Sequence, residues 1–137
     1  MVIVAENCLP SISAPNYANL LKANSCLTQA YKVSVLNGLP QGSSPLKLHC
    51  ASGNDDLGFH TLNINQDFSW KFCESIIQNT LFFCHLWWGS KNIAFDAFSS
   101  NSIEDCPEGV CLWVAKSDGI YFRFNVIGQL EKKYSWQ

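Results

Sequence analysis

The chain has 137 residues, of which 47% are hydrophobic and 15% are charged, and its formal net charge is −2. This length predicts a single domain that can bury a substantial core, and this composition excludes a disordered chain. The nine Lys and Arg residues are scattered, which disfavours nucleic-acid binding, and no apolar run approaches the roughly 18 residues that span a bilayer.

Residues 1–30 differ in character from the rest of the chain. They contain two Pro, several Asn and Ser, and only short apolar pieces. A secretory leader needs a basic flank and about 7–15 apolar residues, whereas the run from Val2 to Ala5 is followed directly by Glu6. We therefore expect residues 1–30 to be an N-terminal extension or a degenerate leader, and residues 31–137 to be the folded domain.

From Tyr31 onward, apolar and polar residues alternate in short segments at roughly ten-residue spacing. Turn-forming pairs such as Asn37-Gly38 and Asp118-Gly119 separate them, because Gly and Asn tolerate a positive φ. The segments cover residues 31–37, 46–50, 57–64, 68–73, 80–88, 93–98, 111–115, 120–125 and 132–136. This pattern predicts an all-β fold, namely an antiparallel β-sandwich of about eight short strands.

The most apolar stretch, residues 79–98, is predicted to form the central hairpin of the sandwich. A turn at residues 89–92 divides it into two strands of period two. The first strand is apolar on both faces, so we expect cover on both sides, or one buried face and one contact face. Trp87 shares a face with Phe83 and His85. Cover by a second sheet is the simpler interpretation of this face, and a contact surface is the alternative because Trp is enriched at binding hot spots.

Motifs of enzymes and metal proteins are missing from the sequence. It contains neither a Gly-x-Ser-x-Gly elbow nor a Gly-x-x-x-x-Gly-Lys phosphate loop. His49 and Cys50, like Cys84 and His85, are neighbours on predicted strands, so each pair points to opposite faces and does not form a close pair of zinc ligands. We therefore predict no catalytic residue, no metal and no cofactor.

Seven cysteines in a chain of this length indicate disulfides and an extracellular destination. Because the number is odd, at least one thiol is free or pairs with another chain.

Several short pieces of the chain form a distinctive series when they are taken in order. They include Leu48-His49-Cys50-Ala51-Ser52, Asn54-Asp55-Asp56-Leu57-Gly58-Phe59-His60, Phe68-Ser69-Trp70-Lys71-Phe72, Cys111-Leu112-Trp113 and Asp118-Gly119-Ile120-Tyr121. This series resembles the plant self-incompatibility protein family, the S-protein homologues. The resemblance covers about Tyr31 to Trp136. It implies a small, secreted, disulfide-bonded β-sandwich that is not an enzyme and that serves as an extracellular recognition ligand for a cell-surface receptor.

Four cysteines fit the pattern of this family, whereas Cys8, Cys26 and Cys73 are additional. The four are Cys50, Cys84, Cys106 and Cys111. Of the three possible pairings, we favour Cys50 with Cys111 and Cys84 with Cys106, because ties between strands and loops would clamp the sandwich. A Cys106–Cys111 bridge is the alternative, because Pro107 and Gly109 can fold so short a loop.

We expect receptor contacts in the loops, because loops on a rigid scaffold carry recognition. The candidate contact residues are Gln41, Asn54, Asp55, Asp56, Asn101, Glu104 and Glu108. The alternative function is a secreted carbohydrate-binding or enzyme-inhibiting module, because aromatic-rich sandwiches often stack sugars.

Overall fold

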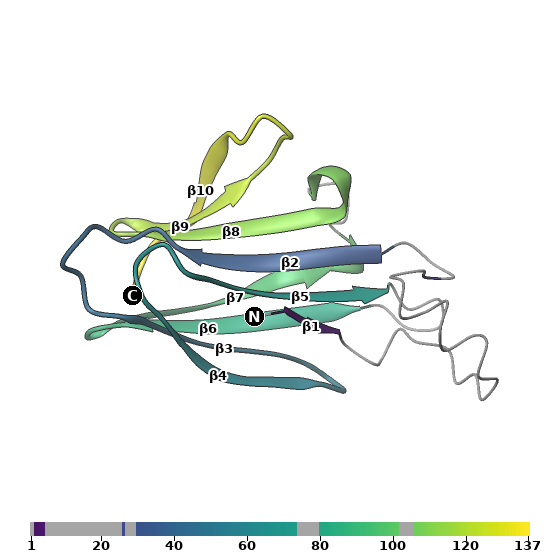
Figure 1. Ribbon diagram of the computed structural model, residues 1–137, viewed down its shortest axis with the longest axis horizontal. Helices are drawn as coiled ribbons and strands as arrows, with labels where there is room; N and C mark the ends of the chain where they lie inside the picture. Colours follow the sequence, from purple (N-terminus) through teal and green to yellow (C-terminus); the bar gives the residue numbers. More distant parts are fainter. Residues whose placement is uncertain (1, 5–25, 27–29, 74–79, 102–105) are drawn as a thin grey trace.

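The protein folds as two β-sheets packed face to face (Figure 1). The computed structural model describes residues 2–4, 26, 30–73, 80–101 and 106–137. Sheet A has six strands and sheet B has four. The predicted disulfide-stabilised, all-β sandwich is confirmed, and the described residues form ten strands where about eight were expected.

Sheet A has the strand order β1-β5-β2-β8-β9-β10. Its strands are β1 (Val2–Val4), β2 (Ala30–Asn37), β5 (Asp67–Cys73), β8 (Val110–Lys116), β9 (Gly119–Arg123) and β10 (Leu130–Tyr134). Two pairings are parallel, β1 with β5 and β2 with β8, and the other three are antiparallel. The sheet centre therefore joins segments that are far apart in the sequence.

Sheet B has the strand order β4-β3-β6-β7, and all its pairings are antiparallel. Its strands are β3 (Leu46–Ser52), β4 (Asp56–Leu62), β6 (Leu81–Trp88) and β7 (Lys91–Ser99). A short 3-10 helix, η3 (Pro107–Gly109), leads into β8. The β6–β7 hairpin is the predicted central hairpin, and it supplies half of sheet B.

The core lies between the two sheets and is built largely from aromatic rings. The ring centroids of Phe72 on β5 and Phe82 on β6 are 4.8 Å apart, and those of Tyr31 on β2 and Phe98 on β7 are 4.9 Å apart. A β-bulge in the β6–β7 ladder turns both Ala97 and Phe98 inward. Strict alternation would have left Phe98 on the outer face.

Three disulfides join described residues: Cys26–Cys73, Cys50–Cys84 and Cys106–Cys111. The favoured pairing of Cys50 with Cys111 and of Cys84 with Cys106 is therefore wrong, and the alternative Cys106–Cys111 bridge is present. The reason is strand register, because Cys50 on β3 lies directly opposite Cys84 on β6 within sheet B, whereas Cys111 lies in sheet A.

Asn37 fastens the end of β2 to the neighbouring sheet. Its side chain is fully buried. Its Nδ2 donates to the carbonyl of Leu62 at 3.0 Å, and its Oδ1 accepts from the backbone N–H of Leu39 at 3.0 Å. The bond to Leu62 connects the end of β2 in sheet A to the end of β4 in sheet B, and the bond from Leu39 fixes the start of the β2–β3 loop.

The described part of the chain contains no helix with the length and apolar character needed to cross a bilayer.

Candidate functional site

The predicted contact residues lie at two opposite ends of the sandwich (Figure 1). The β3–β4 turn and η3 of the β7–β8 connection lie at the same end, the turn at the edge of sheet B and η3 beside sheet A, whereas the β2–β3 loop with Gln41 lies at the other end. Glu104 lies outside the described residues. We name the first end the turn end; its residues are Asn54, Asp55, Asp56, Asn101 and Glu108.

Local hydrogen bonds fix the shape of the β3–β4 turn. The Ser52 Oγ accepts from the backbone N–H of Asn54 at 3.3 Å and from that of Asp55 at 3.0 Å. The Ser52 N–H in turn donates to the Asp55 carbonyl at 2.7 Å. Such side-chain bonds to nearby backbone are the reason that Ser, Asn and Asp favour turns. The exposed side chain of Asn54 therefore projects from a turn that holds its own shape.

Asp56 follows this turn and connects it to sheet B. One of its carboxylate oxygens accepts from the Gly58 N–H at 2.9 Å and lies 2.6 Å from His49 Nε2. The backbone hydrogen bond from Gly58, and after it the side-chain hydrogen bond from His49, lower the pKa of Asp56 below its ordinary value. Because both bonds favour the charged form, Asp56 presents a negative charge at neutral pH.

The β7–β8 connection is closed by the Cys106–Cys111 disulfide, whose cysteines are 5 residues apart in sequence. Glu108 lies inside this small ring with a φ of 54° and an exposed side chain. Asn101, also exposed, donates its N–H to Ser99 Oγ at 3.3 Å. The disulfide thus restricts the backbone around Glu108, and with it the positions that the Glu108 carboxylate can adopt.

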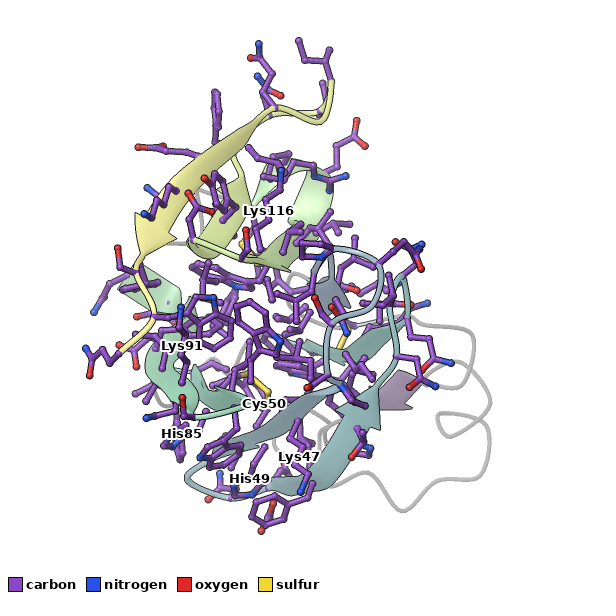
Figure 2. All side chains as sticks on the ribbon, turned by 90° about the vertical axis from the view of Figure 1, so that its left-hand side faces the viewer. Lys47, His49, Cys50, His85, Lys91 and Lys116 are labelled. Atoms are coloured by element: carbon purple, nitrogen blue, oxygen red, sulfur yellow. A yellow bond between two sulfur atoms is a disulfide. The ribbon has the colours of Figure 1, made fainter. Side chains whose placement is uncertain are left out.

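The outer face of sheet B carries a group of uncovered rings, which we name the ring face. Its members are His49, Phe59, Phe83, His85 and Trp87. Phe59 is 73% exposed and Phe83 is 45% exposed. In Figure 2, Lys47, His49 and His85 lie on the outer side of the sheet, away from the Cys50 disulfide in the interior. The expectation that a second sheet covers this face is wrong, because sheet A packs on the opposite face of sheet B.

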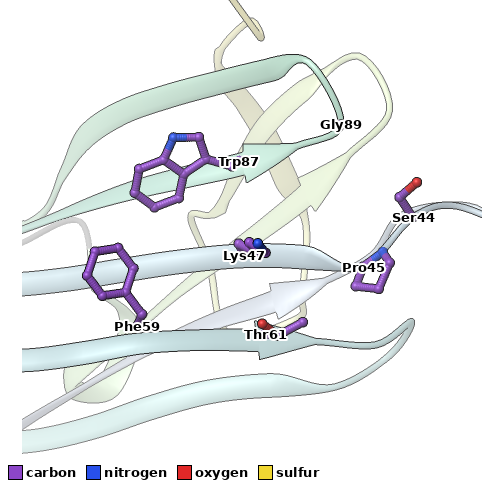
Figure 3. Close-up of a pocket in the computed structure, with 7 residues that line it drawn as sticks. All are labelled: Ser44, Pro45, Lys47, Phe59, Thr61, Trp87 and Gly89. Carbon is purple, nitrogen blue, oxygen red and sulfur yellow. The ribbon is translucent and has the colours of Figure 1, made fainter.

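The rings of this face stack in pairs. The centroids of His49 and Phe59 are 4.3 Å apart with an interplanar angle of 13°. Those of His85 and Trp87 are 4.0 Å apart with an angle of 12°. Phe59 and Trp87 lie beside each other at 6.0 Å and 29°, and Figure 3 shows both rings turned toward the viewer. These stacked rings form an aromatic surface on the outside of sheet B and are not part of the buried core.

A shallow groove of about 620 Å³ runs beside these two rings. Its walls are formed by Ser44, Pro45, Lys47, Phe59, Thr61, Trp87 and Gly89 (Figure 3). Lys47 is the one formally charged residue among them, and it stands on β3 between Trp87 of β6 and Thr61 of β4. The groove therefore combines two aromatic rings, one cation and small polar side chains.

Phe59 was not predicted to lie on the surface, because simple alternation places it on the same face as the buried Leu57. Gly58 adopts a φ of 82°, and the β3–β4 register shifts beside it. The side chains beyond Gly58 consequently change face, so that Leu62 is buried and Phe59 is exposed. A Gly within a strand is the sequence signal of such an irregularity.

His49 and Cys50 point to opposite faces of β3, as the strand geometry predicts. Within the part of the chain that the structure describes, no three His, Cys, Asp or Glu side chains are grouped so that they could hold a metal ion.

Fold and surfaces together define a small, disulfide-bonded β-sandwich protein with loops and rings exposed. The family described as plant self-incompatibility protein S1 matches residues 32–136. The chain belongs to this family, as its sequence resemblance predicts.

Individual relatives agree with this assignment. S-protein homolog 1 of Arabidopsis thaliana is 32% identical over 109 residues, which cover 78% of this chain and 72% of that protein. S-protein homolog 74 of the same plant is 33% identical with the same coverage. The fold is also similar to a solved self-incompatibility protein homologue, with a TM-score of 0.63 at 21% identity over 81% of this chain and 97% of that chain.

Proposed function

We propose that this protein is a secreted recognition ligand that binds a receptor on the surface of another plant cell through its turn end. In this role the protein acts by binding and carries out no reaction. Family membership supports the proposal, as does the description of the structurally similar homologue as one of a family of small, highly stable, secreted plant proteins. Three disulfides in a chain of this size also favour an oxidising compartment.

The main support for the proposal is that two disulfides lie beside the segments of the turn end and restrict their conformations. Cys50–Cys84 joins β3 to β6 just before the β3–β4 turn, and Cys106–Cys111 closes the β7–β8 connection around Glu108. A surface that keeps its bound shape before binding loses less conformational entropy on association. The turn end is thus suited to a specific protein contact.

Charge indicates the character of the receptor surface. Asp55, Asp56 and Glu108 give the turn end three carboxylates, and the lowered pKa of Asp56 keeps its group ionised at neutral pH. Complementary potentials govern encounter and specificity at interfaces. We therefore propose that the receptor offers Lys and Arg residues to this end. Gln41, at the opposite end, is the proposed site of a second, weaker contact.

The test is the binding of labelled protein to intact plant cells. Saturable binding is expected, and both Asn54→Lys and Glu108→Lys should weaken it by about tenfold because each places a cation against a basic receptor. Lys133→Gln, on exposed β10, is the matched control and should bind as the unmodified protein does. Binding that never saturates, or that both turn-end variants retain in full, would refute the proposal.

A further inference from the structure

We infer that the groove on the outer face of sheet B binds an acidic polysaccharide, that is, a chain of sugars that carry carboxylate groups. The groove extends away from the turn end, because the β6–β7 turn and the start of β3, which line the groove, lie at the opposite end of sheet B (Figure 1). Asp56 of the turn end bonds to His49, the ring that stacks on Phe59 of the groove. The inference does not depend on the proposed receptor contact.

Phe59 and Trp87 are oriented to receive a chain of sugars. Their centroids are 6.0 Å apart, and the two rings lie beside each other on the sheet (Figure 3). The axial C–H bonds of a pyranose sugar form an apolar face that packs on an aromatic ring. Two neighbouring rings therefore offer stacking positions to successive sugars of one chain, as aromatic platforms do for the bases of a single nucleic-acid strand.

Polar partners hold the Phe59 and Trp87 rings in place. The imidazole of His49 stacks on Phe59 and bonds to Asp56 at 2.6 Å. The imidazole of His85 stacks on Trp87 and lies 3.0 Å from Asn92 Oδ1. Each aromatic ring thus rests on a fixed imidazole, so that little side-chain entropy is lost when a ligand binds.

Lys47 gives the groove a positive charge. Lys47 is exposed, lies between the two rings and the groove wall, and forms no ion pair with any described residue. No carboxylate lines the groove. A lysine ammonium binds a carboxylate through charge-assisted hydrogen bonds, so an acidic sugar stacked on the rings complements this site better than a neutral sugar does.

The exposure of Phe59 is also informative. Burial of a Phe side chain stabilises a folded protein, and Phe59 forgoes most of this stabilisation while it is 73% exposed. A bound sugar covers the ring. The groove therefore gains apolar burial and charge pairing from the same ligand.

Calorimetry of the disulfide-bonded, full-length protein tests the inference with an oligomer of galacturonate. We expect saturable binding that Trp87→Ala and Phe59→Ser each weaken by about tenfold or more, as for truncated aromatic hot spots. Lys47→Gln should weaken it about two- to fivefold, the range of an exposed ion pair. Phe124→Ala removes a ring that is 47% exposed outside the groove and should leave binding unchanged.

Two further ligands separate the contribution of the sugar rings to binding from the contribution of their charge. The fully methyl-esterified oligomer keeps the sugar rings but lacks their charge, and it should bind more weakly and be unaffected by Lys47→Gln. Polyglutamate keeps the charge but lacks the sugars, and it should not bind detectably. Equal affinity for the ester, equal affinity for polyglutamate, or full retention of binding by Phe59→Ser would overturn the inference. The exposed position of Phe59 makes that variant informative even if Trp87→Ala does not fold.

Discussion

Removal of the Cys50–Cys84 disulfide is predicted to cost about twice the stability lost with the Cys106–Cys111 disulfide. The comparison uses two double variants, Cys50→Ala/Cys84→Ala and Cys106→Ala/Cys111→Ala. In the unfolded chain, the first bridge closes a segment with a sequence separation of 34 and the second closes one of 5. The entropy of closing these loops corresponds to about 4 and about 2 kcal/mol, respectively.

Packing should widen this difference. Cys50 and Cys84 are both buried, at 0% and 1% exposure, within the core between the sheets, whereas in the second bridge Cys111 is equally buried but Cys106 is only partly buried. Loss of the Cys50 and Cys84 sulfur atoms therefore also leaves a small space in the core, which adds to the cost.

Urea unfolding followed by tryptophan fluorescence measures both variants, since the chain has five Trp residues. The free energy of unfolding is obtained by linear extrapolation to water, and the unsubstituted protein is the reference. Equal losses in the two variants, or a greater loss in Cys106→Ala/Cys111→Ala, would refute the argument from loop length and burial.

Three further predictions concern single residues. Asn37→Ala leaves the buried Leu62 carbonyl and Leu39 N–H without their side-chain partner, and it should lower the unfolding free energy by about 1–3 kcal/mol; an unchanged urea midpoint would contradict this. Gly119→Ala would place a Cβ 2.0 Å from the Tyr134 carbonyl oxygen, so β9 and β10 must shift at a cost of about 1–3 kcal/mol. Gly53→Ala meets no atom within 4 Å and is its control, so a similar loss in both variants would argue against the close contact. The Asp56 carboxyl should titrate below its ordinary pKa of 3.8 in an NMR experiment. Because folding lowers this pKa, the contribution of Asp56 to stability is present above the unfolded pKa and is lost as the pH falls through the folded pKa. A midpoint at or above 3.8 would be inconsistent with the Gly58 and His49 bonds.

The strands could be predicted from the sequence because their signal is local. Tyr31, Val33 and Val35 alternate with polar residues, and β2 buries all three. The same holds for Leu46, Leu48 and other inward residues of sheet B. Alternation reflects one buried face per strand, and this requirement acts within a few residues of chain.

Strand partners could not be predicted in this way. The parallel pairing of β2 with β8 depends on how the whole chain is wound, and alternation within β2 carries no information about its neighbour. The disulfide prediction failed for the same reason, because Cys50 meets Cys84 only through the register of β3 on β6. The prediction also missed β1, which pairs with β5 from within residues 1–30.

The candidate surfaces were predicted in part. The turns that carry Asn54 and Glu108 are recognisable from their Gly, Asp and Pro residues, but their position at the same end of the sandwich follows from the strand order. Trp87 was recognised as a possible contact residue, whereas Phe59 required the change of face at Gly58. Local conformations that depart from ideal strand geometry thus determine which rings reach the surface.

The central claim is that this chain is a secreted recognition protein held together by disulfides. The most direct test is to recover the protein from the medium of plant cells and to measure its intact mass with and without reductant. Three disulfides predict that reduction raises the mass by about 6 Da, since each bridge takes up two hydrogens. Protein that stays inside the cells, with every cysteine open to alkylation before reduction, would contradict the claim.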